Sequence, residues 1–243
     1  YHDRFFLYDA PLPMIAQRHY SRGFTLVELA IVLIILALLS GGLMMTLSSQ
    51  VDQRSYRETQ QQLQDIRDAL LGYAASHPAL DGKPYLPCPD TDGDGIENRT
   101  GNLCASAGGQ FPWVTVGFGN QDAWSNRFRY HVTAAFARND IGFTLSTAGT
   151  LRVCEQAACS ATLATQLPVI VVSHGRNGLG GTSSTNVANP AAASADEQEN
   201  TDADTDFVMH TITPPGANEF DDLVIWISPN ILYNRMIAAG RLP

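Results

Sequence analysis

The stretch "RGFTLVELAIVLIILALLSGG" (residues 22–42) is a long apolar run that one carboxylate, Glu28, interrupts near its start. From Phe24 to Leu47, Glu28 is the only charged side chain, and Leu, Ile, Val, Ala and Met dominate. At about 1.5 Å per residue, a helix of this length is long enough to cross a bilayer. The sequence therefore predicts one membrane-spanning helix with an acid that needs an explanation.

The charges on either side of the apolar run predict its orientation. Arg18, His19 and Arg22 precede it, whereas acids enter the segment behind it: Asp52, Glu58, Asp65 and Asp68. The positive-inside rule places the basic side in the cytoplasm. We therefore expect a cytoplasmic N-terminus, a single pass through the inner membrane and a periplasmic head.

The residues before the run have the character of a leader. "YHDRFFLYDAPLP" (residues 1–13) is typical of neither a signal nor a folded element, whereas Met14 opens the short basic stretch "MIAQRHYSRG". We expect residues 14–23 to be the leader that is removed, and residues 1–13 to be upstream translation or the edge of a fragment. Three regions follow: a leader (1–23), an N-terminal membrane and assembly helix (24–77) and a globular head (78–243).

The predicted helix continues beyond the apolar run. Residues 48–78 contain no Pro or Gly before Gly72, and apolar side chains recur at 3-4-3 spacing: Leu63, Ile66, Leu70 and Tyr73. Such a stripe is typical of an amphipathic helix that packs on a core. The "SHP" at residues 76–78 is a plausible stop.

After residue 78 the sequence changes to short strand-like runs between turns. "NRFRYHV" (126–132) alternates apolar and polar residues, which predicts a strand with one buried face. Further candidates are "FTLS" (143–146), "LRVC" (151–154), "LPVIVVS" (167–173), "DFVMHTI" (206–212) and "DDLVIWIS" (221–228), the third and last apolar enough to be central.

A short helix is predicted at the C-terminal end of the head. In "SPNILYNRMIAAG" (228–240), Ser228 is a candidate N-cap, Pro229 suits the first helical position and Gly240 is a stop. The predicted fold class is α+β: a long N-terminal helix packed against an antiparallel β-sheet head, with this short C-terminal helix.

The N-terminal residues resemble a known signature. "RGFTLVELAIVLIILALLSGG" after a basic leader is similar to the start of type IV pilins and type II secretion pseudopilins. The resemblance implies cleavage by a prepilin peptidase after Gly23 and methylation of the new N-terminus at Phe24. One departure is that many family members have a proline late in the apolar helix, where this chain has Gly41 and Gly42.

Glu28 has two interpretations. It could be a stray acid that reaches the lipid headgroups, which costs a few kcal/mol at most near a helix end. The resemblance favours the other, in which Glu28 pairs with the protonated amine of Phe24 on a neighbouring subunit, where a low dielectric strengthens the pairing. Acid and amine would then set the axial register of stacked helices.

The resemblance also implies function, partners and location. The chain would be a structural subunit, not an enzyme, that polymerises with itself or with other pilin-like subunits into a type IV pilus or a secretion pseudopilus. Its partners would be the prepilin peptidase and an inner-membrane platform with a cytoplasmic assembly ATPase. After assembly it would lie in an extracellular or periplasmic filament.

The four cysteines predict two disulfides. Cys88, Cys104, Cys154 and Cys159 lie beyond the predicted anchor in two sequence-local pairs, as expected in an oxidising compartment. Three connectivities are possible, and loop-closure entropy favours the local one, Cys88 with Cys104 and Cys154 with Cys159. Zinc is the alternative, although neither pair has C-x-x-C spacing and no histidine lies close by in sequence.

Two acidic segments are candidate calcium sites. "CPDTDGDGIENRTGNLC" (88–104) holds Asp90, Asp92 and Asp94 in D-x-D-x-D-G order, which can place three carboxylates around a hard cation. The bidentate acid of an EF-hand is missing, because that position is Gly101. Glu97 and Asn98 could replace it only in another loop geometry, and a solvated turn is the alternative.

The second acidic segment closes a low-complexity loop of residues 173–207. Major pseudopilins of type II secretion bind calcium in a loop of their C-terminal sheet region, and this tract is similar in character. A solvated surface is the alternative. The candidate ligands are Glu197, Glu199, Asp202 and Asp204, flanked by Asp196 and Asp206.

Composition limits the remaining function classes. Of the 243 residues, 24 are acidic and 15 basic, and the formal charge of −9 gives no reason to expect nucleic acid as a partner. Ser173 and His174 are adjacent, but no G-x-S-x-G elbow surrounds the serine, and no glycine pattern matches a phosphate-binding loop. The alternative to a pilin-like subunit is a periplasmic hydrolase or binding protein on an uncleaved signal anchor.

Overall fold

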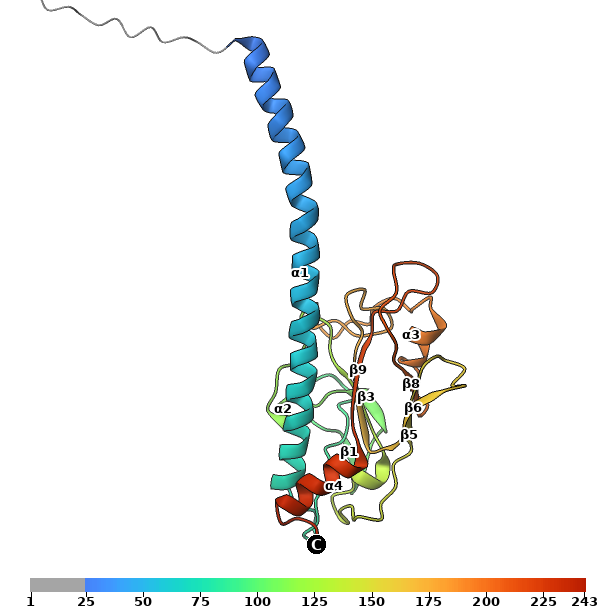
Figure 1. The fold of residues 1–243 in the computed structure, drawn as a ribbon. Coiled ribbons are helices and arrows are strands. Elements are labelled where there is room, and N and C mark those ends of the chain that lie inside the picture. Colours follow the sequence, from blue (N-terminus) through green and yellow to red (C-terminus); the bar gives the residue numbers. More distant parts are fainter. Residues whose placement is uncertain (1–24) are drawn as a thin grey trace, which may run out of the picture. The chain divides into compact units, whose positions relative to one another are not determined.

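A computed structural model of the chain describes residues 25–243, except for the side chains of residues 40–49. The predicted leader, with Gly23 and Phe24, lies outside the described residues. The chain divides into two compact units, Tyr1–Ser48 and Ser49–Pro243. Helix α1 (Leu26–Ser76) belongs to both (Figure 1).

Helix α1 is continuous over 51 residues, as the sequence predicts. Its last turns bury the predicted stripe, because Leu63, Ile66, Leu70 and Tyr73 are all at most 6% exposed. It ends at Ser76, directly before the His77–Pro78 pair. Within the described residues, we find no helix that combines the length and the apolar character needed to cross a bilayer.

The main sheet of the unit Ser49–Pro243 has four antiparallel strands in the order β3-β4-β7-β9. Tyr130 pairs with Val171, which pairs in turn with Ile225, so the register aligns three apolar residues across the sheet. The four strands are β3 (Gly108–Gln110), β4 (Arg129–Val132), β7 (Val169–Ser173) and β9 (Leu223–Ile227).

A smaller sheet has the order β6-β5-β8, and its strands are β5 (Leu151–Cys154), β6 (Thr162–Leu167) and β8 (Asp206–Val208). Strand β5 runs antiparallel to β6 but parallel to β8, so the predicted antiparallel head holds for the main sheet only. The remaining elements are the hairpin strands β1 (Arg99–Thr100) and β2 (Leu103–Cys104), the helices α2 (Trp113–Val116), α3 (Ala195–Glu199) and α4 (Pro229–Ala238), and the 3-10 helix η1 (Ala134–Phe136).

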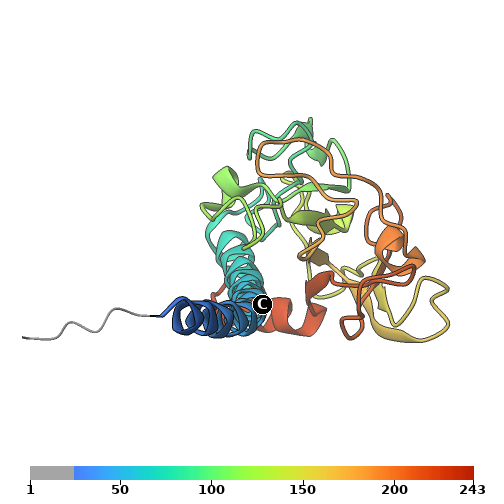
Figure 2. The same cartoon turned by 90° about the horizontal axis from the view of Figure 1, so that it is seen from above.

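Three layers make up the core of this unit (Figures 1 and 2). Strand β7 is buried on both faces: Val169 and Val171 join the cluster that contains α1 and α4, whereas Ile170 and Val172 join the cluster of the small sheet. The main sheet is therefore the middle layer. Strand β7 is apolar from Val169 to Val172 for that reason.

Three predictions about strands are corrected. "FTLS" (143–146) forms a turn rather than a strand, because the Thr144 amide donates to the Thr147 hydroxyl and the Thr147 amide donates to the Thr144 carbonyl. Strand β9 lies at the edge of its sheet, although it packs on both faces. The strand predicted at 126–132 is the shorter β4, and both of its faces are buried, because Phe207 of the small sheet covers His131 with ring centroids 4.9 Å apart.

The two predicted disulfides are confirmed, with the sequence-local connectivity. Cys88 and Cys104 have Cα atoms 5.2 Å apart, and the bond ties β2 to the segment before the first acidic loop. Cys154 at the end of β5 is bonded to Cys159, five residues later. None of these thiols is available to a zinc ion.

Candidate functional site

The first turn of α1 is closed by Thr25 and Glu28. The Thr25 amide and hydroxyl each donate to Glu28 Oε2 at 2.9 Å, and the Glu28 amide donates to the Thr25 hydroxyl at 3.2 Å. This reciprocal arrangement is a capping box, which satisfies amide groups that the helix itself leaves unpaired. The signal in the sequence was the T-x-x-E spacing, which the sequence analysis did not use.

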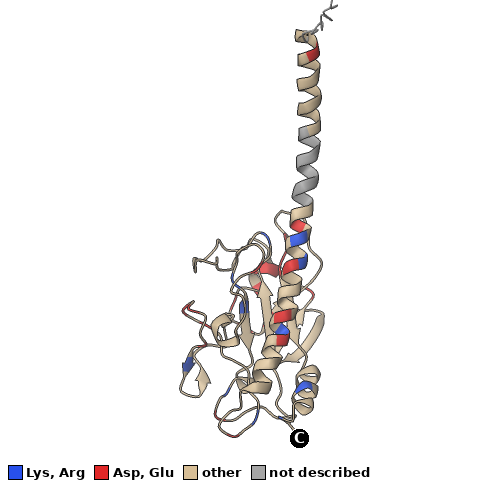
Figure 3. Cartoon of the chain, turned by 90° about the vertical axis from the view of Figure 1, so that its left-hand side faces the viewer, with Lys and Arg blue, Asp and Glu red and all other residues tan. Residues whose placement is uncertain are grey.

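Glu28 is exposed at this end of α1 while its apolar neighbours are exposed too. Leu26, Leu29 and Leu33 are at least 52% exposed. Figure 3 shows an acidic position near the start of α1. The capping box therefore uses one oxygen of the carboxylate, and the helix presents the acid together with an uncovered apolar surface.

The first acidic loop brings its three predicted carboxylates together, because one oxygen each from Asp90, Asp92 and Asp94 lie within 4.8 Å of one another. Buried Asp90 organises the loop: its Oδ1 accepts the Gly93 amide at 2.7 Å and its Oδ2 accepts the Gly95 amide at 2.8 Å. Burial raises the pKa of Asp90, whereas the bond from the Asp94 amide leads the effects that lower the pKa of Asp92.

Gly95 is needed in this loop for two reasons. Its φ of +87° is the left-handed conformation that glycine adopts without strain, and a Cβ there would lie 2.3 Å from the ring of Trp113. Of the proposed substitutes for the missing EF-hand acid, Glu97 is engaged outside the acidic triplet, whereas Asn98 bonds within the loop and donates to Asp92 Oδ2 at 3.3 Å. Glu97 accepts the Cys88 amide and pairs with Arg99, and Asn98 accepts the Thr91 amide.

The second acidic segment does not act as one unit. Glu199, Asp202 and Asp204 lie within 4.8 Å of one another, and burial together with the neighbouring acids, Asp204 first, raises the pKa of Glu199 to about 7. The flanking acids are paired: Asp196 accepts the Ala157 amide, and Asp206 forms a bidentate pair with Arg152. Calcium at the first loop or at this segment stays a prediction.

Glu197 lies apart from these acids, in a cluster that the sequence analysis did not foresee. Its ligand oxygen lies within 4.8 Å of those of Asp221 and Asp222, two residues that directly precede β9. Burial, and then the charge of Asp222, raises the pKa of Glu197 and brings the pKa of Asp221 to about 7. The only signal in the sequence was an adjacent pair of acids before an apolar strand.

The Ser173–His174 pair is not arranged as a nucleophile and base. The Ser173 hydroxyl is fully buried and donates to Asp122 at 2.6 Å, while His174 lies beside Asp222. Asp122 also accepts the Trp124 and Asn126 amides, so its carboxylate holds the turn at residues 122–126. This cluster has the geometry of a buried polar network in the core.

Comparison with known families identifies the N-terminal segment. Residues 18–44 match the family described as "Prokaryotic N-terminal methylation motif", the signature of type IV pilins and pseudopilins. The match contains Glu28 and the Gly23–Phe24 bond. No curated protein and no solved structure matches the chain at a significant level. The chain therefore carries a pilin-type processing motif at its N-terminal side.

Proposed function

We propose that this protein is a pilin-like structural subunit that is cleaved between Gly23 and Phe24 and polymerises through its N-terminal helix. The observation that carries the proposal is the match of residues 18–44 to the methylation motif. The exposed apolar surface at the start of α1, with Glu28 beside it, supports it, because such a surface is costly in water unless lipid or other helices cover it.

We propose the topology that the charges around the apolar run favour. The leader stays in the cytoplasm, α1 anchors the precursor in the inner membrane through its first half, and the head lies in the periplasm. The disulfides support an oxidising compartment for the head. Subunits then leave the bilayer for a filament, either a type IV pilus or the pseudopilus of a type II secretion system.

Processing is tested by mass spectrometry of the protein from cells that contain a prepilin peptidase. We expect the N-terminal peptide to begin with N-methyl-Phe24. A Gly23→Leu variant is the control, because it blocks the cut without altering the head. An intact leader, or a cut near Gly42, contradicts the proposal, and the intact leader favours a signal-anchored periplasmic hydrolase or binding protein.

The role of Glu28 in assembly is tested by separating its charge from its capping bond. Glu28→Gln keeps an oxygen that accepts the Thr25 amide but removes the charge, whereas Thr25→Ala removes the hydroxyl that completes the box and keeps the charge. If the charge pairs with the Phe24 amine of a neighbouring subunit, Glu28→Gln reaches the membrane but does not enter filaments, and Thr25→Ala still enters them.

The measurement is the amount of each variant in sheared filaments relative to the membrane fraction. A capping role alone predicts the reverse order of defects, since losing a cap costs about 1 kcal/mol of helix stability. Normal incorporation of both variants contradicts assembly through this residue, whereas absence of the wild-type protein from filaments favours the anchored hydrolase or binding protein.

A further inference from the structure

The cluster formed by Glu197, Asp221 and Asp222, here called the buried carboxylate cluster, concentrates acids in the core. These residues are only 1%, 9% and 4% exposed, and one carboxylate oxygen from each lies within 4.8 Å of the others. Two calcium–oxygen bonds of about 2.4 Å on opposite sides of an ion span about 4.8 Å. The spacing therefore suits one hard cation between the three groups.

Each carboxylate accepts hydrogen bonds; both oxygens of Glu197 have a partner, whereas each aspartate has one oxygen without a partner. Glu197 Oε1 accepts the Asp221 amide at 3.0 Å, Asp221 Oδ2 accepts the Asn177 amide at 2.9 Å, and Asp222 Oδ2 accepts the Asn200 side chain at 2.9 Å. The other oxygens of the aspartates, both Oδ1, are shielded from water and have no hydrogen-bond partner. Unpaired buried oxygens of this kind are costly unless a ligand satisfies them.

The cluster also lacks a permanently charged cationic partner among the described residues. Across the described residues, no lysine or arginine forms an ion pair with any of its three members; Arg176, close in sequence to Asn177, pairs with Asp52 instead. His174 Nδ1 lies 3.6 Å from Asp222 Oδ1, too far for a hydrogen bond, and is itself unpartnered although its side chain is 2% exposed. His174 thus lies at one wall of the cluster, within ion-pair distance of Asp222.

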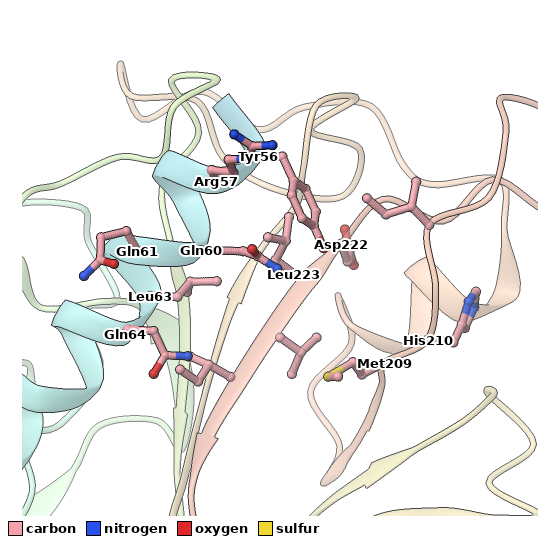
Figure 4. A pocket seen from close by; sticks show the side chains of 13 residues that line it. Tyr56, Arg57, Gln60, Gln61, Leu63, Gln64, Met209, His210, Asp222 and Leu223 are labelled. Carbon is pink, nitrogen blue, oxygen red and sulfur yellow. The ribbon is translucent and has the colours of Figure 1, made fainter. Parts of the chain in front are cut away.

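Two surface grooves lead to the cluster. Asp222 lines a groove of about 480 Å³ between α1 and residues 209–225, where it lies near Tyr56 and Leu223 (Figure 4). Asp221 lines a second groove of about 660 Å³. The cluster therefore lies directly beneath two grooves that solvent fills, so the entry path that a metal site requires is short.

We propose that a hard divalent cation of the size of Ca²⁺ binds between the carboxylates of Glu197, Asp221 and Asp222. The two asparagines, Asn177 and Asn200, position the carboxylates as outer-shell partners. The ion links α3, in the long loop after β7, to the start of β9 in the main sheet. This site takes Glu197 from the second acidic segment that the sequence suggested but its two aspartates from outside both segments, and it does not depend on the proposed assembly function.

The competing explanation is that protons, rather than a metal, neutralise the cluster. Burial favours protonation of Asp221, so a metal-free cluster could hold a proton at neutral pH. Two measurements distinguish the cation from protons. Only the cation is recovered as metal bound to the folded chain, and only with the cation does the melting temperature rise as the metal concentration rises.

The test uses the full chain in detergent, stripped with EGTA and then titrated separately with CaCl₂, MnCl₂ and MgCl₂, with bound metal and melting temperature measured. A quadruple variant, Asp92→Asn/Asp94→Asn/Asp202→Asn/Asp204→Asn, removes the exposed acids of the other two clusters and leaves the buried one intact. We expect this variant to retain one Ca²⁺ per chain and a rise in melting temperature.

Single changes are then made in the quadruple variant. Glu197→Gln and Asp222→Asn should each weaken calcium binding at least about tenfold. Tenfold is the lower end of the loss seen when an outer-shell partner is changed, and changing a direct ligand should cost no less. If the quadruple variant binds no Ca²⁺ or Mn²⁺, or if neither single change alters binding, the proposal is overturned and the cluster holds protons. If a single variant does not fold, the proposal is judged by whether the quadruple variant binds Ca²⁺.

Discussion

His131 is an imidazole without a hydrogen-bond partner at Nε2, enclosed between Gly108 and the ring of Phe207. Burial, and then the charge of Arg129, lowers its pKa from 6.5 to about 3. In the unfolded chain the ring protonates near its ordinary pKa, whereas in the folded chain it stays neutral. Stability from this group is therefore complete above pH 6.5 and is lost as the pH falls toward 3.

His131→Phe is expected to flatten the dependence of unfolding free energy on pH in this window. The wild-type protein should lose about 1.4 kcal/mol per pH unit through this group as the pH falls. Urea unfolding between pH 4 and pH 7 measures the slope, and His77→Phe, at an exposed histidine, is the control. An unchanged slope in His131→Phe contradicts the buried neutral state.

The two halves of helix α1 have different surroundings. Leu70 is fully buried against the main sheet, whereas Leu33 is 57% exposed. The periodic stripe decides which side of the second half faces the core, and the Thr25–Glu28 box fixes where the helix begins. Periodicity and capping are local properties, so both are visible in the sequence.

Leu70→Ala is expected to lower the unfolding free energy of the globular unit by about 2–5 kcal/mol, because it leaves a cavity between α1 and the sheet. Gln64→Ala, on the exposed side of the same helix, should change it by about 0.5 kcal/mol or less. Guanidinium titration of the full chain in detergent compares them. Equal losses would mean that the stripe does not dock on the core.

The sequence predicted the local features of the fold better than the nonlocal ones. Helix α1, strand β7 and helix α4 follow from spacing and turn residues near them in the chain. The parallel pairing of β5 with β8 and the meeting of Glu197 with Asp222 depend on contacts between distant segments. No period or spacing encodes such contacts, so these features needed the structure.

At the scale of the molecule, the two disulfides should differ in their effect on stability. The bond between Cys88 and Cys104 closes a loop of 16 residues, against five for Cys154 and Cys159, and Cys88 also lies in the main core cluster. Loop-closure entropy gives about 3 kcal/mol for the longer loop and about 2 kcal/mol for the shorter.

Replacing each pair with alanines should therefore lower the melting temperature more for Cys88/Cys104 than for Cys154/Cys159. Differential scanning calorimetry of the two double variants makes the comparison, with the oxidised wild type as reference. The opposite order would show that the short bond supports the small sheet more than its loop length implies.

The main core cluster joins Leu63 in α1 to Leu242, near the last residue of the chain. The ribosome makes the N-terminal part of the chain first. The apolar stripe of α1 therefore stays exposed until nearly 180 further residues have been made. Folding of the head is therefore postponed until the ribosome has made α4. Prematurely terminated chains expose the stripe, which is the kind of surface that quality-control proteases and chaperones detect.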